Sequence, residues 1–381
     1  MNPPIYLDYN ATTPHDPEVI EVMRPFLTDY FGNPSSSHWY GAQTKNAVDR
    51  AREQVASLLK CVPDEIVFTS GGTESNNYAI KGIAFSQRDK GNHIITSQIE
   101  HPAVLEVCKF LEEHGFEVSY LPVDQFGMVK VSDVEKAITP KTILITIMHA
   151  NNEVGTIQPI EQISDSAGEH GVIFHTDAAQ SVGKIPIDVN ELGVDLLSVA
   201  GHKLYAPKGV GALYVRKGVC LEKFLHGAGH ESGRRPGTEN VLEIVGLGKA
   251  CEIAARDIVK NIRHMKQMRD KLHSGLKETI TDMQLNGHPV DRLPNTFNVS
   301  FRGVNANEFL AGIEDKVAVS VGSACHSSEQ ICFSPVLQAM KVDPEWAMGT
   351  VRFSVGKFTS ESEIDQVIQI FSTGLINAKR D

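Results

Sequence analysis

The most informative stretch of the chain is Asp195–Tyr214, which reads DLLSVAGHKLYAPKGVGALY. Its first apolar run, 196–200, is typical of a buried strand and breaks at a glycine. His202 and Lys203 follow directly, and a glycine-rich return leads into a second apolar run at 212–215. We therefore expect the lysine at the mouth of a sheet, where its amine is kept neutral and can form a Schiff base with a carbonyl. Taken alone, the motif also fits an ordinary surface lysine in a hairpin.

Two apolar runs upstream end in groups that complement this lysine. The run 171–174 leads to Asp177, and Gln180 follows three residues later. A carboxylate at a strand end can keep a pyridine nitrogen protonated, so that a pyridoxal ring acts as an electron sink while a lysine carries its aldehyde. The run 66–69 passes through two glycines into a helix start at Thr73, where free backbone amides favour an anion. Three such motifs in order predict a site for pyridoxal 5'-phosphate (PLP).

Strand-like and helical segments alternate over the first two thirds of the chain. This alternation predicts an α/β fold with a mainly parallel sheet between helices, and ligands collect at the carboxyl ends of such strands. A long helix is predicted at 240–281, followed by a small α+β domain whose last helix opens with a capping box at Ser360 and Glu363. The predicted strands are 66–69, 94–97, 118–123, 143–148, 172–175, 196–200, 212–215, 297–301, 317–321 and 351–355. The predicted helices include 17–29, 44–60, 73–85, 102–114, 160–170, 307–312, 335–340 and 363–377.

The composition favours a cytoplasmic protein. The 381 residues suffice for about two domains, and 36 Lys and Arg against 47 Asp and Glu give a net charge of −11. This charge argues against nucleic acid or an anionic membrane as a direct partner. The longest apolar run, 142–148, is far shorter than a membrane span of about 18 residues, and no signal peptide is recognised. The cysteines lack metal-ligand spacing, so we expect free thiols and no metal site. Four of them are expected to be buried: Cys61, Cys108, Cys220 and Cys251.

With these motifs, the chain resembles the NifS/IscS-like cysteine desulfurases, which are fold-type-I PLP enzymes similar to class V aminotransferases. The resemblance runs from Tyr6 to Gly356 and covers almost the whole chain. It implies a large PLP-binding domain over 15–260 and a small domain, formed by 1–14 and 261–381, that carries the catalytic cysteine loop. The motifs that follow the family's order are FGNPSSSHWYG, TSGGTESNN, NNEVG, HTDAAQ, GHKLYAPKGVGALY, RPGTEN and GSACHSS.

The resemblance implies roles for the residues around the cofactor ring. Lys203 would carry the cofactor, and Asp177 would pair with its pyridine nitrogen. Gln180 would donate to the phenolic oxygen, and Asn152 would lie beside that oxygen and the substrate. His101 would stack on the ring and help move protons, although on sequence alone it could equally be a capping or core histidine.

The phosphate site is likewise implied by the resemblance. Gly72, Thr73 and His202 match phosphate ligands of the family. Thr238 in RPGTEN matches the ligand that the partner subunit lends, which implies a homodimer with shared active sites. Iron–sulfur-type members usually carry a serine where this chain has Ala200, so one hydroxyl contact is missing or comes from elsewhere, and we expect weaker cofactor retention.

Cys325 in GSACHSS is the predicted nucleophile, because a thiol among small residues after a strand can reach into a site. The alternative for such a thiol is a buried packing role. By resemblance, its thiolate attacks the sulfur of L-cysteine, keeps that sulfur as a persulfide and leaves L-alanine. Arg352 would clamp the substrate carboxylate, where bidentate geometry suits arginine.

The segment after Cys325 departs from the family pattern. It reads HSSEQICFS, and ACHS followed by SPVL also resembles the selenocysteine lyases. Cys332 lies between Ile331 and Phe333, an apolar setting that favours a packing role over the alternative of a resolving thiol.

The predicted function is therefore a homodimeric cysteine desulfurase that passes sulfur to an acceptor protein. Iron–sulfur cluster assembly, tRNA thiolation and DNA sulfur modification all remain open as the pathway. Two alternative functions also remain: a selenocysteine lyase of the same fold, and a non-catalytic scaffold. Intact Lys203, Asp177 and Cys325 argue against the scaffold.

Overall fold

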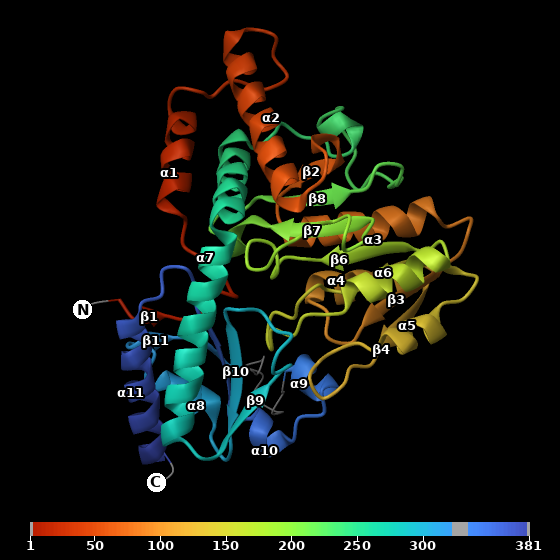
Figure 1. Ribbon diagram of the computed structural model, residues 1–381. Coiled ribbons are helices and arrows are strands. Elements are labelled where there is room, and N and C mark those ends of the chain that lie inside the picture. Colours follow the sequence, from red (N-terminus) through yellow and green to blue (C-terminus); the bar gives the residue numbers. More distant parts are fainter. Residues whose placement is uncertain (1–2, 322–333, 379–381) are drawn as a thin grey trace.

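A seven-stranded sheet dominates the structure, a computed structural model that describes residues 3–321 and 334–378 (Figure 1). Its strands, in their order across the sheet, are β2 (Ile66–Thr69), β8 (Gly211–Val215), β7 (Leu196–Ala200), β6 (Ile173–Asp177), β5 (Thr142–Thr146), β3 (His93–Ser97) and β4 (Glu117–Leu121). Only β8 runs antiparallel to its neighbours β2 and β7, while the remaining pairs are parallel. The prediction of a mainly parallel sheet is confirmed.

Both faces of this sheet are buried because its strands are apolar at successive positions. Side chains alternate between the two faces of a strand, so Leu197 and Leu196 of β7 belong to two different cores. The core around Leu197 includes residues of α1 (Pro17–Met23), α2 (Trp39–Leu59), α5 (Val131–Ala137), α6 (Ile160–Glu169) and the first half of α7 (Val241–Thr279). The core around Leu196 includes residues of α3 (Gly72–Ser86) and α4 (Pro102–Glu113).

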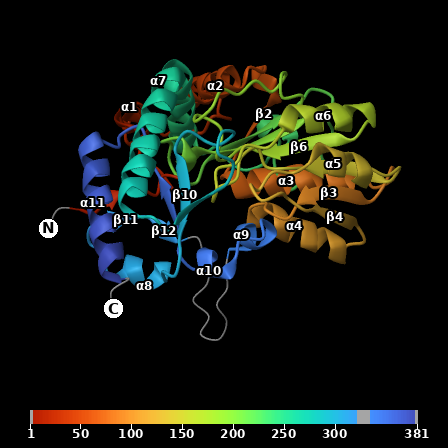
Figure 2. The ribbon, with the colours of Figure 1, turned by 60° about the horizontal axis from the view of Figure 1, so that its bottom comes forward.

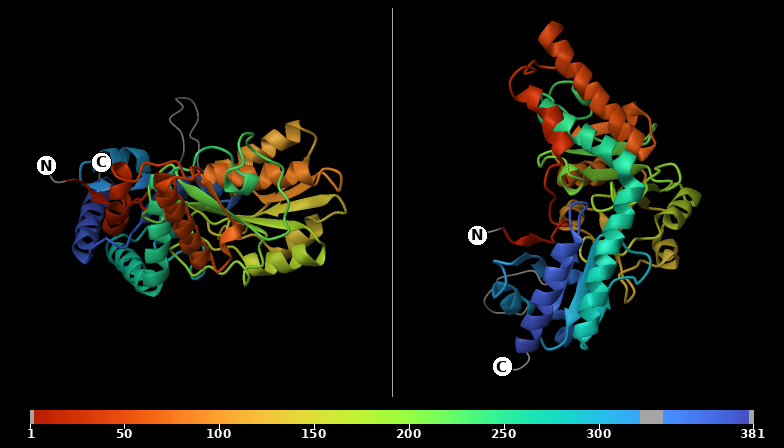
Figure 3. Two further views of the ribbon diagram at one scale, coloured as in Figure 1. Left: turned by 90° about the horizontal axis from the view of Figure 1, so that it is seen from above. Right: turned by 60° about the vertical axis from the view of Figure 1, so that its left-hand side comes forward.

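A second, antiparallel sheet lies beside the other half of α7 (Figures 2 and 3). Its strand order is β12 (Ser320–Val321), β13 (Thr350–Ser354), β10 (Thr296–Phe301) and β9 (Met283–Asn286). A third core joins this sheet to α7, α8 (Ala306–Ala311) and α11 (Glu361–Ala378). The short helices α9 (Pro335–Ala339) and α10 (Pro344–Ala347) lie between β12 and β13 in the chain, and β1 (Ile5–Tyr6) pairs with β11 (Val317–Ala318). The predicted domain limits stay a prediction.

Three details differ from the sequence-based expectations. The first helix ends at Met23 and continues as a 3₁₀ turn, because Pro25 cannot donate the next helical hydrogen bond. Helix α2 begins at Trp39, five residues earlier than predicted, with the His38 side chain accepting from the Gly41 amide. Cys220 is exposed and Cys61 half-buried, so only two of the four cysteines expected in the core are buried, Cys108 and Cys251.

The capping box is a prediction that is confirmed at the level of single contacts. The capping box at α11 forms, with reciprocal bonds between Ser360 and Glu363. Along residues 3–321 and 334–378, no helix combines the length and apolar character needed to cross a membrane, and no cluster of potential metal ligands occurs.

Candidate active site

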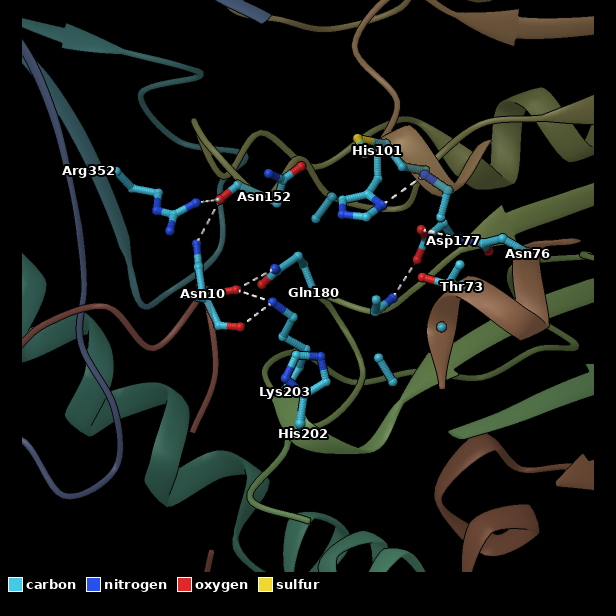
Figure 4. A pocket seen from close by; sticks show the side chains of 17 residues that line it. Asn10, Thr73, Asn76, His101, Asn152, Asp177, Gln180, His202, Lys203 and Arg352 are labelled. Carbon is cyan, nitrogen blue, oxygen red and sulfur yellow. Dashed lines mark hydrogen bonds between the residues drawn. The ribbon is translucent and has the colours of Figure 1, made fainter. Parts of the chain in front are cut away.

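One pocket gathers almost all of the predicted site residues, because the strands that precede them end at the same edge of the sheet. It is a cavity of about 240 Å³ at the carboxyl ends of β2, β3, β5, β6 and β7 (Figure 4). Convergence of side chains at this edge is the arrangement in which α/β sheets bind ligands. The predicted residues that line the cavity are Gly72, Thr73, His101, Asn152, Asp177, Gln180, His202, Lys203 and Arg352.

Asp177 brings a buried carboxylate to the end of β6. It accepts hydrogen bonds from the Asn76 side-chain amide at 2.7 Å and from the Ala179 backbone at 2.9 Å. Among the described residues it forms no ion pair, although its side chain lies at the cavity wall. A buried carboxylate held only by neutral donors is costly unless a cation joins it. The carboxylate therefore fits a ligand that offers a protonated nitrogen.

The start of α3 forms an open anion site at another wall of the cavity. Gly71, at the cap position, has a φ of 150°, which favours glycine. A Cβ on Gly72 would lie 3.2 Å from the Cβ of Ala200, a tight contact that glycine avoids. Gly72 and Thr73 line the cavity at this point, and the backbone amides of a first helical turn have no partner within the helix and favour an anion. This end of the cavity fits a phosphate group.

Lys203 lies directly after β7, in a 3₁₀ turn at 201–203. Its amine donates to the backbone carbonyls of Asn10 and Ala11, at 2.5 and 2.7 Å. Burial, followed by the positive charge of Arg352, lowers the pKa of Lys203 to about 8, against the opposing effect of Asp8 and Asp177. At pH 7 about a tenth of the amine is then neutral, far more than for an ordinary lysine, and the neutral form is the one that acts as a nucleophile.

The two histidines of the pocket are both kept neutral. His101 caps α4 by accepting from the Ala103 amide at 3.1 Å, so it is a capping residue and a pocket residue at once. Burial lowers its pKa against the opposing charge of Asp177, and Lys203 adds to the lowering. For His202, burial and the nearby lysines lower the pKa to about 4, and its Nδ1 lies 3.2 Å from the Thr12 hydroxyl.

Arg352 reaches the cavity from β13 of the second sheet. Its guanidinium donates to Asp8 at 2.7 Å, to the Ser320 hydroxyl at 2.9 Å and to the Asn152 carbonyl at 3.1 Å. Its Nε is buried without a partner among the described residues. The guanidinium thus brings a positive charge, already paired with Asp8, to the cavity wall near the Lys203 amine.

Three pocket-side residues were missed by the sequence reasoning. Asn10 and Asn76 line the cavity, and Lys184 lies behind Gln180. Asn76 falls inside TSGGTESNN and Lys184 four residues after Gln180, so both could have been considered. Asn10 gives no local signal, because its partners are distant in sequence. Its backbone N–H, for example, donates to the Ser354 hydroxyl at 2.9 Å.

Two predicted residues are not in the cavity. Thr238 is exposed in the segment between β8 and α7, outside the pocket of its own chain. Cys325 falls outside the described residues, as does Cys332. The described cavity therefore concerns the predicted contacts to cofactor and substrate, and not the predicted roles of Cys325 and Thr238.

Comparisons with known proteins find similar sequences and structures over almost the whole chain. The profile of the family described as Aminotransferase class-V matches residues 5–367. The chain is 50% identical over 371 residues to the cysteine desulfurase IscS of Dictyoglomus turgidum, covering 97% of this chain and 94% of that protein. It is similar to the structure of a NifS-like protein, with a TM-score of 0.90 and 40% identity over 98% of this chain and 99% of that one. It is also similar to SspA in complex with cysteine, with a TM-score of 0.82 and 41% identity over 93% and 100% of the two chains.

Proposed function

The chain belongs to the class V aminotransferase family, whose cysteine desulfurases are PLP-dependent, and from that membership we propose that it removes sulfur from L-cysteine with bound PLP. One observation carries the proposal. The buried Asp177 carboxylate, without an ion-pair partner in the described part of the chain, lies at the same cavity as the Lys203 amine, whose pKa is lowered to about 8. PLP carries on one ring a pyridine nitrogen that can pair with the Asp177 carboxylate and an aldehyde that can react with the Lys203 amine.

The residues present fit the whole cofactor. Asp177 would hold the ring nitrogen, and Gln180 would donate to the phenolic oxygen. Gly72, Thr73 and His202 would hold the phosphate, and the neutral His101 would lie against the ring. When bound, PLP supplies an electron sink for the carbon atoms of the substrate.

The chain's own groups then supply binding and proton transfer. Arg352 orients the substrate through its carboxylate, with Asn152 beside it. When the substrate amine replaces Lys203 on PLP, the neutral Lys203 amine is free to take up and return protons at the substrate. The thiolate of Cys325 attacks the substrate sulfur, the carbon–sulfur bond breaks, and a persulfide on Cys325 and L-alanine result. This sulfur passes to an acceptor protein in the cytoplasm.

Steady-state turnover tests this function against its two alternatives. With PLP-loaded protein and a thiol reductant, we expect alanine from L-cysteine, together with sulfide. Alanine from L-selenocysteine alone would identify a selenocysteine lyase, which the segment after Cys325 also resembles. Protein that stays colourless after PLP is added, and releases no alanine from either substrate, would support a non-catalytic scaffold.

We also propose that the enzyme is a homodimer, on the evidence of an exposed apolar surface. Leu27, Phe31, Trp39 and Tyr40 are between 46% and 72% exposed, although they are large hydrophobic side chains. Phe31, Trp39 and Tyr40 lie together at the start of α2, where Phe31 stacks on Tyr40 at 5.2 Å and Tyr40 packs on Trp39 at 5.1 Å. In Figure 1 the start of α2 is at the end of the molecule farthest from the second sheet. A group of this kind on one surface is typical of a protein contact.

Thr238 gives this dimer a measurable consequence. If the partner subunit supplies its hydroxyl to the phosphate, Thr238→Ala should weaken PLP binding about tenfold, the loss of one hydrogen bond to a charged group. The dissociation constant is measured by titrating apoprotein with PLP. Thr281→Ala, at an exposed position far from the cavity, is the matched control and should bind PLP like the wild type. A stable monomer with full cofactor and full activity would contradict the shared site.

A further inference from the structure

Lys184 is a buried lysine beside the pocket that the proposed chemistry does not use. It is 4% exposed, and its amine donates to the Gln180 side-chain oxygen at 2.7 Å and to the Asn10 side-chain oxygen at 2.9 Å. Burial lowers its pKa well below the usual value, and the positive charges of Lys203 and Arg352 add to that effect. Charged or neutral, the amine retains the two N–H donors that these bonds require.

The contact with Lys184 decides which end of the Gln180 amide faces the cavity. A glutamine amide has one oxygen and one NH₂ group, and the two ends can exchange by rotation. The two N–H donors of the Lys184 amine both go to side-chain oxygens, those of Gln180 and Asn10, so the amide nitrogen of Gln180 is turned away from that amine. That nitrogen donates one hydrogen to the Asn10 backbone carbonyl at 3.0 Å. Gln180 lines the cavity (Figure 4), and its second N–H is left for a ligand.

The same amine also fixes Asn10, which contacts the nucleophilic lysine. The side-chain oxygen of Asn10 accepts from Lys184 and, at 2.9 Å, from Asn295. The backbone carbonyl of Asn10 accepts from both Lys203 and Gln180. Lys184 therefore holds both the Gln180 amide and Asn10, the residue whose carbonyl accepts from Gln180 and Lys203.

We infer that Lys184 is a positioning residue, which holds the Gln180 amide with its nitrogen toward the cavity and so favours an anionic ligand oxygen at that place. The inference rests on the proposed function, in which this oxygen is the phenolic oxygen of PLP. Without Lys184, the amide can rotate and present its own oxygen, which would repel the anion.

The pH at which the visible absorbance of PLP-loaded protein changes is the readout. A donor to an anionic oxygen favours the form with one proton fewer, so losing the donor raises the midpoint of that change. Lys184→Met removes the donors at similar volume, and we expect a midpoint about one pH unit higher, with PLP bound about tenfold more weakly. Lys184→Gln keeps a donor group and should restore part of the shift.

A double-mutant cycle separates positioning from a direct effect of the lysine's charge. Gln180→Leu should raise the midpoint as Lys184→Met does, and the double variant should add little to either single change. Additive shifts, or a Lys184→Met midpoint equal to the wild type, would overturn the inference. If Lys184→Met does not fold, the cycle is run with Lys184→Leu, which also removes the donors, under the same criteria.

Lys357→Met is the matched control. Lys357 is a comparably buried lysine, 11% exposed at its side chain, but its amine pairs with Asp16. Its loss should lower the unfolding temperature of the apoprotein and leave the absorbance midpoint unchanged. A midpoint that moves as far in this control as in Lys184→Met would also overturn the inference. Wild-type protein that never takes up PLP would refute the proposed function itself, which distinguishes that failure from this one.

Discussion

Replacing Lys203 by alanine is expected to abolish covalent attachment of PLP and to lower turnover of L-cysteine at least about 10³-fold, because one residue supplies both the attachment and the proton transfer. Borohydride should bleach the visible absorbance of the wild type and leave the mass of the cofactor on the peptide that contains Lys203. The variant should hold PLP only until dialysis. Lys208→Ala, an exposed lysine outside the cavity, is the control and should behave as the wild type. A Lys203→Ala spectrum equal to the wild type would refute the assignment.

The pH dependence of PLP uptake gives a second view of the same amine. Only the neutral amine attacks an aldehyde, and burial together with Arg352 lowers the pKa of Lys203 to about 8. The rate of covalent uptake by apoprotein should therefore rise about tenfold per pH unit below 8 and level off above it. The amine of N-acetyl-lysine methyl ester should continue to accelerate toward pH ~10. Arg352→Gln should move the midpoint of the protein's rate–pH curve to higher pH, because it removes a positive charge that lowers the pKa of Lys203.

The sequence predicted best where local pattern alone determines structure. Strands β2 and β7 begin and end at the predicted residues, because each is a short apolar run bounded by polar or glycine residues. Strand β9 was missed because MQLN has too few apolar residues, and its Asn286 is buried through bonds to Asn298 and Ser300. Local periodicity carries no information about such pairings.

The same division holds for the candidate site. Residues that follow strand ends, such as Asp177 and Lys203, could be predicted because parallel strands bring their carboxyl ends together. Asn10 could not, because its role depends on contacts with residues 142 or more positions away, such as Asn152, Gln180 and Lys203. Lys184 gave a weak signal, since a lysine in a polar turn is usually exposed.

Cys325 and Cys332 pose the second question of large effect, namely which thiol receives the sulfur. Cys325 has small neighbours in GSACHSS, which allow a close approach to a bound substrate. Cys332 lies between Ile331 and Phe333, an apolar setting that disfavours the thiolate needed for attack. The rival view makes Cys332 a resolving thiol that attacks the persulfide on Cys325 and closes a disulfide.

Replacing each thiol by serine decides between these readings. Cys325→Ser should stay yellow and change its spectrum when L-cysteine binds, yet form no persulfide and lose alanine turnover at least about 10³-fold, because the nucleophile is gone. Cys332→Ser, seven positions away, is the matched control and should keep most of its turnover when a thiol reductant is present. Persulfide is measured by mass spectrometry of alkylated protein, and alanine by derivatisation. A Cys332→Ser protein that is folded, yellow and as inactive as Cys325→Ser would mean that sulfur is received by Cys332, or by both thiols in relay.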